Sequence, residues 1–372
     1  MNDDQIADAE PEEHPTEGEP QLSGKFQVDG GRWASRSTRI ALGSTAALLA
    51  LAAAVSWAAR RIERSHPPMG NFIEVDGVRV HYVDVGEGEP VVLLHGNASM
   101  LQETYLGLVD RLAGRHRVIA FDRPGFGYSE RPKNVTWTPE AQMELLRGAF
   151  RQLGIERLVL YGHSWGAPLV VTYALHHPGD IRGVVAASGY YYPNRRLDAA
   201  MAVLNGAPVI GPICRNTISP VMNAIMGPLA LRLLFSPNPV PPTYAEFPAS
   251  LSLRPVAIRA AGEDGMTLRD WAARTSPRYG EIRAPVVIVA GTDDKAVDYR
   301  GHSMRLHHDI PGSRLHIWPN TGHMVHHSRT EEVIQSIEEV FEMADDRSAG
   351  ASAESGGAER AGAPEEAVVT AS

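Results

Sequence analysis

The chain has 372 residues, 43% of them hydrophobic and 21% charged, so it carries enough apolar side chains to form a large core. The net charge of −9 comes from the two ends, since residues 1–39 carry −5, residues 345–372 carry −4, and the stretch between them is neutral. A neutral middle argues against a nucleic-acid partner. The single cysteine, Cys214, excludes an intramolecular disulfide and lies in no motif that indicates a catalytic thiol.

Both ends of the chain are expected to be disordered. Residues 1–39 are polar and acidic, and residues 345–372 are rich in Ala, Glu, Gly and Ser. Such segments bury too little apolar surface to offset the entropy lost on ordering. We therefore place no chemistry in either tail.

Residues 40–59 contain no charged side chain and, as a helix, are long enough to cross a bilayer. Arg39 and Arg60 bound this run, and Trp33 and Trp57 lie near its ends, as interfacial aromatics do. A cleavable signal peptide or a buried Ala-rich helix are the alternatives, and the long polar leader and flanking arginines argue against them. We expect a single-pass membrane anchor. Basic residues nearly balance on its two sides, so they favour an extracytoplasmic catalytic domain only slightly.

After residue 70 short apolar runs alternate with helical patterns. This alternation predicts an α/β fold with a doubly wound, mostly parallel sheet that is covered on both faces. Asp76-Gly77 lies between the first two runs and is typical of a hairpin turn. The predicted strands are 72–75, 78–85, 91–94, 118–121, 158–161, 183–187, 286–290 and 315–318.

Residues 190–278 break this rhythm and are rich in Pro, Met and Leu. Helical patterns in this segment predict an insertion that covers the sheet as a cap, and its charges and prolines make it a poor second membrane span. The core is then 67–189 together with 279–344. The expected cap helices are 197–204, 221–235 and 266–273.

The segment Gly162-His163-Ser164-Trp165-Gly166 has the form Gly-x-Ser-x-Gly and lies between an apolar strand and a helix. A serine on so sharp a turn is exposed at the edge of the sheet, and the glycines avoid collisions with neighbouring backbone. The N-terminus of the following helix favours the negative charge that develops beside the hydroxyl. This setting indicates Ser164 as a nucleophile.

Three further segments follow strand ends in the order that such a site requires. His95-Gly96-Asn97 follows the strand that ends at Leu94, where the backbone N–H of Asn97 can join that of Trp165 in an oxyanion hole. Adjacent aspartates, Asp293 and Asp294, follow the strand 286–290. Gly322-His323 follows the last strand, which gives the chain order Ser, Asp, His.

These motifs together resemble the α/β-hydrolase fold superfamily over residues 70–344. The resemblance implies a triad of Ser164, His323 and Asp294, because the acid of that superfamily usually stands three residues after a glycine such as Gly291. Asp293 and Asp298 are the remaining candidates for the acid. Carboxylic-ester hydrolysis through an acyl-enzyme is then the expected reaction, without a metal or an organic cofactor.

One detail resembles a different reaction. Asn97 together with Trp165 is similar to the halide-binding pair of haloalkane dehalogenases, which use an aspartate as nucleophile. A serine in that position would give an ether that water cannot cleave at a carbonyl, so Ser164 argues against dehalogenation and epoxide hydrolysis. Perhydrolysis and carbon–carbon bond hydrolysis on the same triad stay open.

The apolar, Met-bearing insertion favours a small lipophilic ester or acyl substrate, although Met201, Met222 and Met226 equally fit simple packing. A ligand-binding protein without activity is the alternative to an enzyme. Such a protein usually lacks one member of the triad, and here all three positions are filled. Histidines without a motif, such as His81 and His326, are interpreted as surface or packing residues, and His163, beside the nucleophile, as a residue that shapes the pocket or packs below it.

Overall fold

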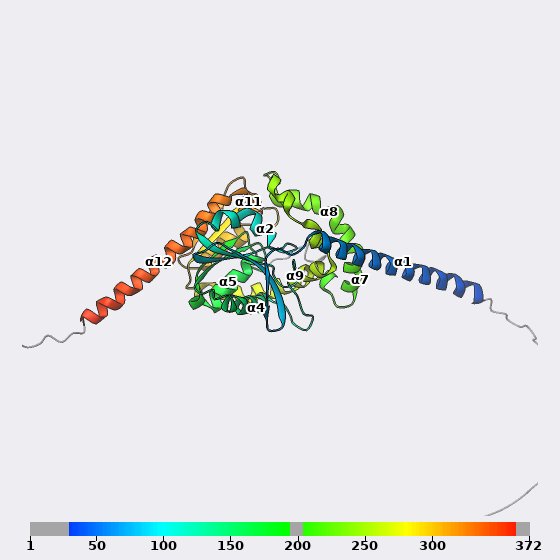
Figure 1. Cartoon of the computed structure of the whole chain (residues 1–372), viewed down its shortest axis with the longest axis horizontal. Helices are drawn as coiled ribbons and strands as arrows, with labels where there is room; N and C mark the ends of the chain where they lie inside the picture. Colours follow the sequence, from blue (N-terminus) through cyan, green and yellow to red (C-terminus); the bar gives the residue numbers. More distant parts are fainter. Residues whose placement is uncertain (1–29, 194–203, 362–372) are drawn as a thin grey trace, which may run out of the picture. The chain divides into compact units, whose positions relative to one another are not determined.

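The computed structural model describes residues 30–193 and 204–361, and the side chains of 37–193 and 204–349 (Figure 1). Two compact units are distinguished, residues 1–48 and residues 49–372, and the second holds the sheet and the candidate site. The expected helix at 197–204 lies almost wholly outside the described residues.

A long apolar helix, α1 (Gly30–Ser65), precedes the sheet. By length and composition its segment Ser37–Ser65 could cross a membrane, a property that anchors and signal sequences share. Our expected boundaries, a tail to residue 39 and a helix over 40–59, are wrong for the helix itself, which begins earlier and ends later. The flanking Arg, Ala and Glu residues are good helix formers, so charge ends the apolar run without ending the helix.

The sheet has eight strands in the order β1-β2-β4-β3-β5-β6-β7-β8. The pairs β1–β2 and β2–β4 are antiparallel and the other pairs are parallel, which confirms the mostly parallel sheet of the prediction. The strands are β1 (Asn71–Val75), β2 (Val78–Val85), β3 (Glu89–Leu94), β4 (His116–Phe121), β5 (Leu158–His163), β6 (Ile181–Ala187), β7 (Val286–Gly291) and β8 (Arg314–Trp318).

The predicted hairpin is present between β1 and β2. Val75 pairs with Val78, and the two residues between them, Asp76 and Gly77, have φ values of +50° and +75°. A two-residue turn of this kind needs positive φ at both positions, which Asp-Gly tolerates. The antiparallel part of the sheet therefore begins where the sequence indicates.

Helices cover both faces of the sheet. Contacts place α4 and α5 on one face and η1, α3 and α12 on the other, with α7 to η5 inserted between β6 and β7. The helices and helical turns after α1 are α2 (Gln102–Thr104), η1 (Tyr105–Val109), α3 (Asp110–Leu112), α4 (Pro139–Gln152), α5 (Gly166–His176), η2 (Pro178–Asp180), α7 (Ile210–Asn216), α8 (Ile218–Phe235), η3 (Pro242–Glu246), η4 (Ala249–Leu253), α9 (Pro255–Thr275), η5 (Ser276–Glu281), η6 (Arg300–Met304), α10 (Arg305–Asp309), α11 (Val325–Ser328) and α12 (Thr330–Ala361).

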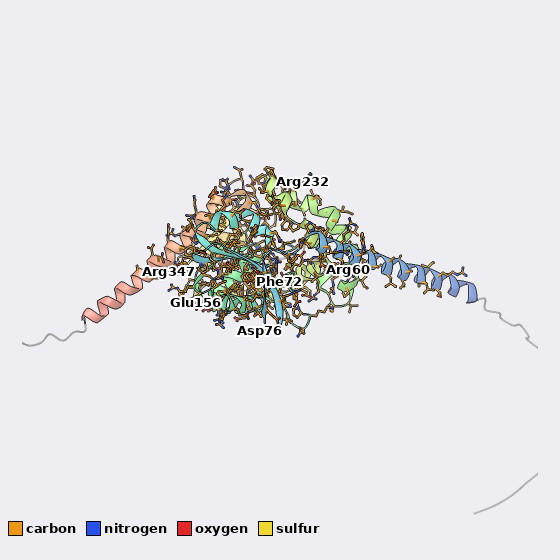
Figure 2. All side chains as sticks on the ribbon, viewed as in Figure 1. Arg60, Phe72, Asp76, Glu156, Arg232 and Arg347 are labelled. Carbon is orange, nitrogen blue, oxygen red and sulfur yellow. The ribbon has the colours of Figure 1, made fainter. Side chains whose placement is uncertain are left out.

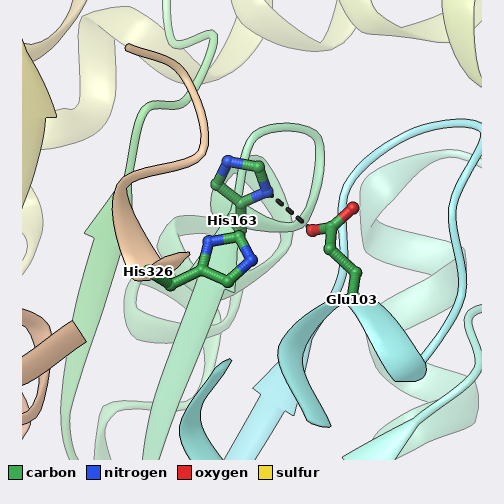
Figure 3. A group of neighbouring side chains, drawn as sticks. All are labelled: Glu103, His163 and His326. Atoms are coloured by element: carbon green, nitrogen blue, oxygen red, sulfur yellow. Dashed lines mark hydrogen bonds and ion pairs between the residues drawn. The ribbon is translucent and has the colours of Figure 1, made fainter. Parts of the chain in front are cut away.

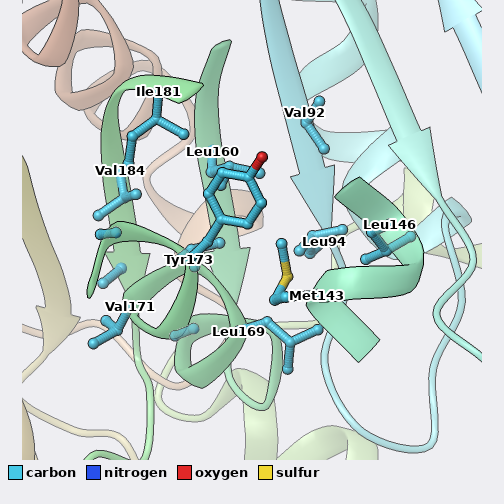
Figure 4. Packing of buried hydrophobic residues seen from close by; sticks show 14 of the residues in the cluster. Val92, Leu94, Met143, Leu146, Leu160, Leu169, Val171, Tyr173, Ile181 and Val184 are labelled. Carbon is cyan, nitrogen blue, oxygen red and sulfur yellow. The ribbon is translucent and has the colours of Figure 1, made fainter. Parts of the chain in front are cut away.

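Two hydrophobic clusters lie on the opposite faces of the sheet. Leu158 and Leu160 of β5 belong to the cluster beneath α4 and α5, whereas the alternate residues Val159 and Tyr161 belong to the cluster beneath α12. Figure 4 shows the first cluster, where Leu169 of α5 packs with strand side chains. Side chains of a strand point alternately to its two faces, so near-continuous apolar strands fill both clusters.

The last helix corrects the expectation that the chain is disordered from residue 345. Helix α12 instead continues from Thr330 to Ala361. The alanines in this stretch favour a helix although its glycines and serines do not, and a helix already packed on the sheet can extend through them without a new nucleus. Low hydrophobicity was therefore the wrong criterion for the end of helix α12.

Candidate active site

Ser164 lies on a sharp turn between β5 and α5. Its φ of +53° is in the left-handed region, as at the nucleophile turn of a hydrolase. Glycine is required on both sides, because a Cβ at Gly162 would lie 2.3 Å from the Gly166 carbonyl oxygen and one at Gly166 would lie 2.5 Å from the Leu94 carbonyl oxygen. The Ser164 N–H donates to the Ala187 carbonyl at 2.8 Å, which fixes the turn to strand β6.

Asp294 and His323 come from loops that follow the neighbouring strands β7 and β8. His323 Nδ1 lies 2.7 Å from Asp294 Oδ2, and both side chains are buried. Asp294 Oδ1 accepts from the backbone N–H groups of Ala296 (2.7 Å) and Val297 (2.9 Å). Burial raises the pKa of the Asp294 carboxyl, but His323 and these two donors hold it below its usual value. The carboxylate is therefore ionised beside the imidazole.

The other two aspartates considered for the acid have different partners. Asp293 accepts from Thr292 Oγ1 at 2.6 Å, and Asp298 accepts from two backbone N–H groups of its own turn. Within the described residues Ser164 Oγ makes no hydrogen bond to His323. The contact between such a serine and its histidine is often long when no substrate is bound, so the arrangement is compatible with proton transfer from Ser164 to His323.

The loop after β3 lies against the serine. A Cβ at Gly96 would be 3.1 Å from Ser164 Cβ, so the expected oxyanion loop is in contact with the nucleophile turn. The backbone N–H groups of Asn97 and Trp165 have no intramolecular acceptor among the described residues. Two free donors beside a serine are what an oxyanion requires. Trp165 Nε1 is also buried without a partner in the described chain.

Arg123 holds this loop from below, a role that the sequence did not indicate. Its side chain is fully buried and donates to the carbonyls of His95 (3.0 Å) and Gly96 (2.9 Å). It also lies 4.6 Å from the Trp165 ring centroid, and its charge is met by Asp264 of α9 at 2.7 Å. The turn that begins at Asp122, directly after strand β4, thus supports the candidate oxyanion loop.

Figure 3 shows a buried cluster of Glu103, His163 and His326, which lies next to the candidate triad because the His163 ring centroid is 4.8 Å from that of His323. Nitrogen and oxygen atoms of the three side chains lie within 4.8 Å of one another, a spacing compatible with a metal ion. His163 Nδ1 is 2.7 Å from Glu103 Oε1, and His163 Nε2 is 3.0 Å from the His323 carbonyl oxygen. Both of these partners only accept hydrogen bonds, so both His163 nitrogens carry protons and offer no lone pair to a metal.

The cap adds a pocket of about 260 Å³ beside the oxyanion loop. Asn97 and Ala98 form one side of it, and Ile218, Met222 and Ile258 of the cap helices form part of the other. The pocket is mostly apolar, as small-molecule sites usually are. A substrate in it would lie next to the candidate oxyanion donor of Asn97.

Helix α8 contains one charged residue, Arg232, which is labelled in Figure 2, and its residues 221–230 are all exposed. By length and composition it is the second helix of the described chain that could cross a membrane, which we did not expect. Its last turn is nevertheless part of the domain, because Phe235 is fully buried and the Leu234 carbonyl accepts from His323 N–H at 2.8 Å. A helix that is apolar on all sides normally has a nonpolar environment.

Comparison with known proteins agrees with this geometry. Residues 89–330 match the α/β hydrolase fold family. The chain belongs to that family. Curated relatives of this α/β hydrolase include haloalkane dehalogenase 2 of Mycobacterium tuberculosis, 26% identical over 71% of this chain and 91% of the relative. Another is the 2-hydroxy-6-oxo-2,4-heptadienoate hydrolase of Pseudomonas putida, 27% identical over 69% and 90%.

Solved structures show the same fold at lower identity. An esterase from Exiguobacterium antarcticum has a TM-score of 0.60 and 21% identity, covering 74% of this α/β hydrolase and all of the esterase. A membrane phospholipase A described as a bacterial virulence factor has a TM-score of 0.59 and 21% identity, covering 84% and 99%. The relatives cleave different bonds, so membership of the family does not identify the bond.

Proposed function

We propose that this α/β hydrolase is a membrane-anchored serine hydrolase that cleaves carboxylic esters. The observation that carries the proposal is the hydrogen-bonded, buried pair of Asp294 and His323, in loops next to a serine with positive φ. Asp294 and His323 follow the adjacent parallel strands β7 and β8, and Ser164 follows β5 of the same sheet, at the strand ends where catalytic groups of such sheets gather. The backbone N–H groups of Asn97 and Trp165, which have no acceptor among the described residues, add the electrostatic part of the site.

Each residue then has one chemical role. His323 takes the proton of Ser164 as the hydroxyl attacks the acyl carbonyl, and Asp294 holds the proton of the imidazole on Nδ1. The N–H groups of Asn97 and Trp165 bind the oxygen that becomes negative. His323 returns the proton to the leaving alcohol, and then activates the water that releases the acyl group from Ser164.

The nucleophile favours an ester over a carbon–halogen bond. An alkyl halide would leave Ser164 as an ether with no carbonyl for water to attack, even though a dehalogenase is among the relatives. Carbon–carbon bond hydrolysis is the second candidate, because the Pseudomonas putida relative is named for a dienoate substrate and a serine triad can perform both reactions. A panel of p-nitrophenyl esters and vinylogous 1,5-diketones separates the two.

The cap supports a lipophilic substrate taken from a membrane. Ile225 is 65% exposed and Leu229 53% exposed on α8, and the same helix lines the pocket through Met222. The apolar segment of α1 would keep the domain near a bilayer, where the exposed side of α8 can lie among lipid chains. The side of the membrane on which the domain lies stays a prediction, with a slight preference for the extracytoplasmic side.

The first experiment is to treat the full-length protein in detergent with a fluorophosphonate and measure its intact mass. We expect one adduct on the wild type and none on Ser164→Ala or His323→Ala. Ser188→Ala is the matched control, because Ser188 also follows a central strand with positive φ (+47°) but is fully buried. A folded wild type that gains no adduct would contradict the proposal and favour a ligand-binding role.

A further inference from the structure

Glu103 and His163 connect three loops of the candidate site. Glu103 Oε1 accepts from the Gly96 N–H at 3.0 Å, in the loop that carries the oxyanion donor Asn97. The same oxygen accepts from His163 Nδ1 at 2.7 Å, one residue before the nucleophile. His163 Nε2 donates to the His323 carbonyl at 3.0 Å, in the loop of the general base. One continuous path of hydrogen bonds therefore links the oxyanion loop, the nucleophile turn and the base loop.

The charges in this path are fixed by the partners. His163 must be an imidazolium, because both of its nitrogens face acceptors. Burial lowers the pKa of His163, but the Glu103 carboxylate more than compensates and raises it above the usual value. Burial raises the pKa of Glu103, but His163 holds it well below the usual range. The pair is thus a buried, mutually neutralised ion pair with hydrogen bonds to satisfy it.

We propose that Glu103 and His163 are positioning residues, which set the oxyanion loop and the His323 loop relative to Ser164. Neither side chain is assigned to touch the reacting atoms, and this inference rests on the proposed serine hydrolase function. Misplacement of catalytic groups by about 1 Å can lower a rate by about 10²-fold, so a link of this kind has a large kinetic effect. The side chains of Glu103 and His163 are at least 95% buried, so water does not compete for the hydrogen bonds between them.

His326 is the third member of the cluster and packs against His163 as a neutral side chain. It is fully buried, and neither ring nitrogen has a partner in the described chain. Its ring centroid is 4.5 Å from that of His163 in an edge-on arrangement, and burial holds its pKa well below the usual value. A metal ion could use His326 and Glu103, but it would first have to displace the Nδ1 proton of His163. The structure favours the proton-holding pair over a metal site.

The test compares Glu103→Leu, Glu103→Gln and His163→Leu in the full-length protein in detergent, with kcat and KM for an ester, melting temperature and the rate of fluorophosphonate labelling. The leucine variants are expected to lose about 10²-fold in kcat with KM within about threefold, because the cap pocket is untouched. The glutamine oxygen can still accept from Gly96 N–H and from Nδ1–H of a neutral His163, so only the donation from His163 Nε2 to the His323 carbonyl is lost, and Glu103→Gln should stay within about tenfold of wild type. His116→Leu is the matched control, because it breaks another histidine–carboxylate pair, with Glu338 at 3.1 Å, at the end of the sheet where strand β4 begins and away from the candidate site.

Several results would overturn the inference. Wild-type kcat in both leucine variants would do so, as would an equal loss in His116→Leu or a loss of wild-type activity to a chelator that zinc restores. If the leucine variants do not fold, Glu103→Gln and His163→Gln decide the question. A kcat loss confined to His163→Gln supports the path, and wild-type values in both variants contradict it. A wild type that neither labels nor hydrolyses esters is a failure of the proposed function instead.

Discussion

Replacing Asp294 with asparagine should disable the general base without disturbing its position. Asp294 Oδ1 accepts from two backbone N–H groups, at 2.7 and 2.9 Å, so in the variant the amide oxygen must take that place. The amide NH2 group then replaces Oδ2, which lies 2.7 Å from His323 Nδ1. Since this NH2 group can only donate, His323 must present a lone pair at Nδ1 and carry its proton on Nε2. An imidazole in that tautomer cannot accept the proton of Ser164.

We expect kcat for an ester to fall by about 10⁴-fold in Asp294→Asn, as for the wrong tautomer in a serine protease, with an unchanged melting temperature. Asp293→Asn and Asp298→Asn are matched controls in the same loop, because neither contacts His323, and both should stay within about twofold of wild type. Kinetics with p-nitrophenyl esters from pH 6 to 9 and thermal unfolding measure both quantities. An Asp294→Asn variant that keeps a tenth of wild-type kcat would refute the tautomer argument, and an equal loss in Asp293→Asn would reassign the acid.

Three further predictions concern stability and the membrane. Burial lowers the pKa of His95 and of His327 from 6.5 to about 4, so between these pH values the unfolded state binds more protons than the folded state. The free energy of unfolding should therefore fall as the pH drops from 6.5 to 4. Urea unfolding at pH 7.5, 6 and 5 should show this decrease, and the decrease should be smaller in His327→Gln. Arg123→Met should cost about 3–5 kcal/mol, because it leaves the buried His95 and Gly96 carbonyls without their donor, while Asp264 keeps Arg131 at 3.0 Å. Arg117→Met, at a partly exposed pair, should cost about 1 kcal/mol or less, and equal denaturant midpoints for the two variants would contradict this. The double variant Ile225→Glu, Leu229→Glu should bind vesicles more weakly than the wild type at an unchanged melting temperature, whereas Val135→Glu, at an exposed apolar position outside the cap, should bind them equally well. Flotation with vesicles after protease removal of α1 measures this binding. Equal flotation of the wild type, the double variant and Val135→Glu would argue against lipid contact by α8.

The candidate nucleophile, acid and base could be predicted from the sequence because each follows a strand end and has a glycine nearby. Local patterns of this kind reflect steric limits that act within a few residues, such as the one at Gly166. The supporting residues could not be found in this way. Glu103 pairs with a residue 60 positions later, and Arg123 pairs with Asp264 across 141 positions. No local rule indicates which of 44 acidic side chains meets which histidine or arginine.

Element ends were the other weak point. The predicted boundaries of α1 and α12 were wrong because charge and low hydrophobicity indicate which residues of a helix are exposed to solvent. They do not indicate whether its backbone hydrogen bonds continue. The one useful signal for the buried cluster was the composition around His323, where His326 and His327 follow closely on the chain. A dense group of histidines beside a predicted base deserves inspection for buried partners.

The hydrogen bond from His323 N–H to the Leu234 carbonyl ties the end of α8 to the residue proposed as the base. A cap attached in this way cannot swing open as a rigid lid about its other end without pulling on the imidazole. Entry of substrate would then have to come from movement nearer the start of α8, with the Leu234 end acting as a fixed pivot. Opening of the cap at the Leu234 end would then also displace the imidazole of His323, so substrate entry and proton transfer would be mechanically coupled.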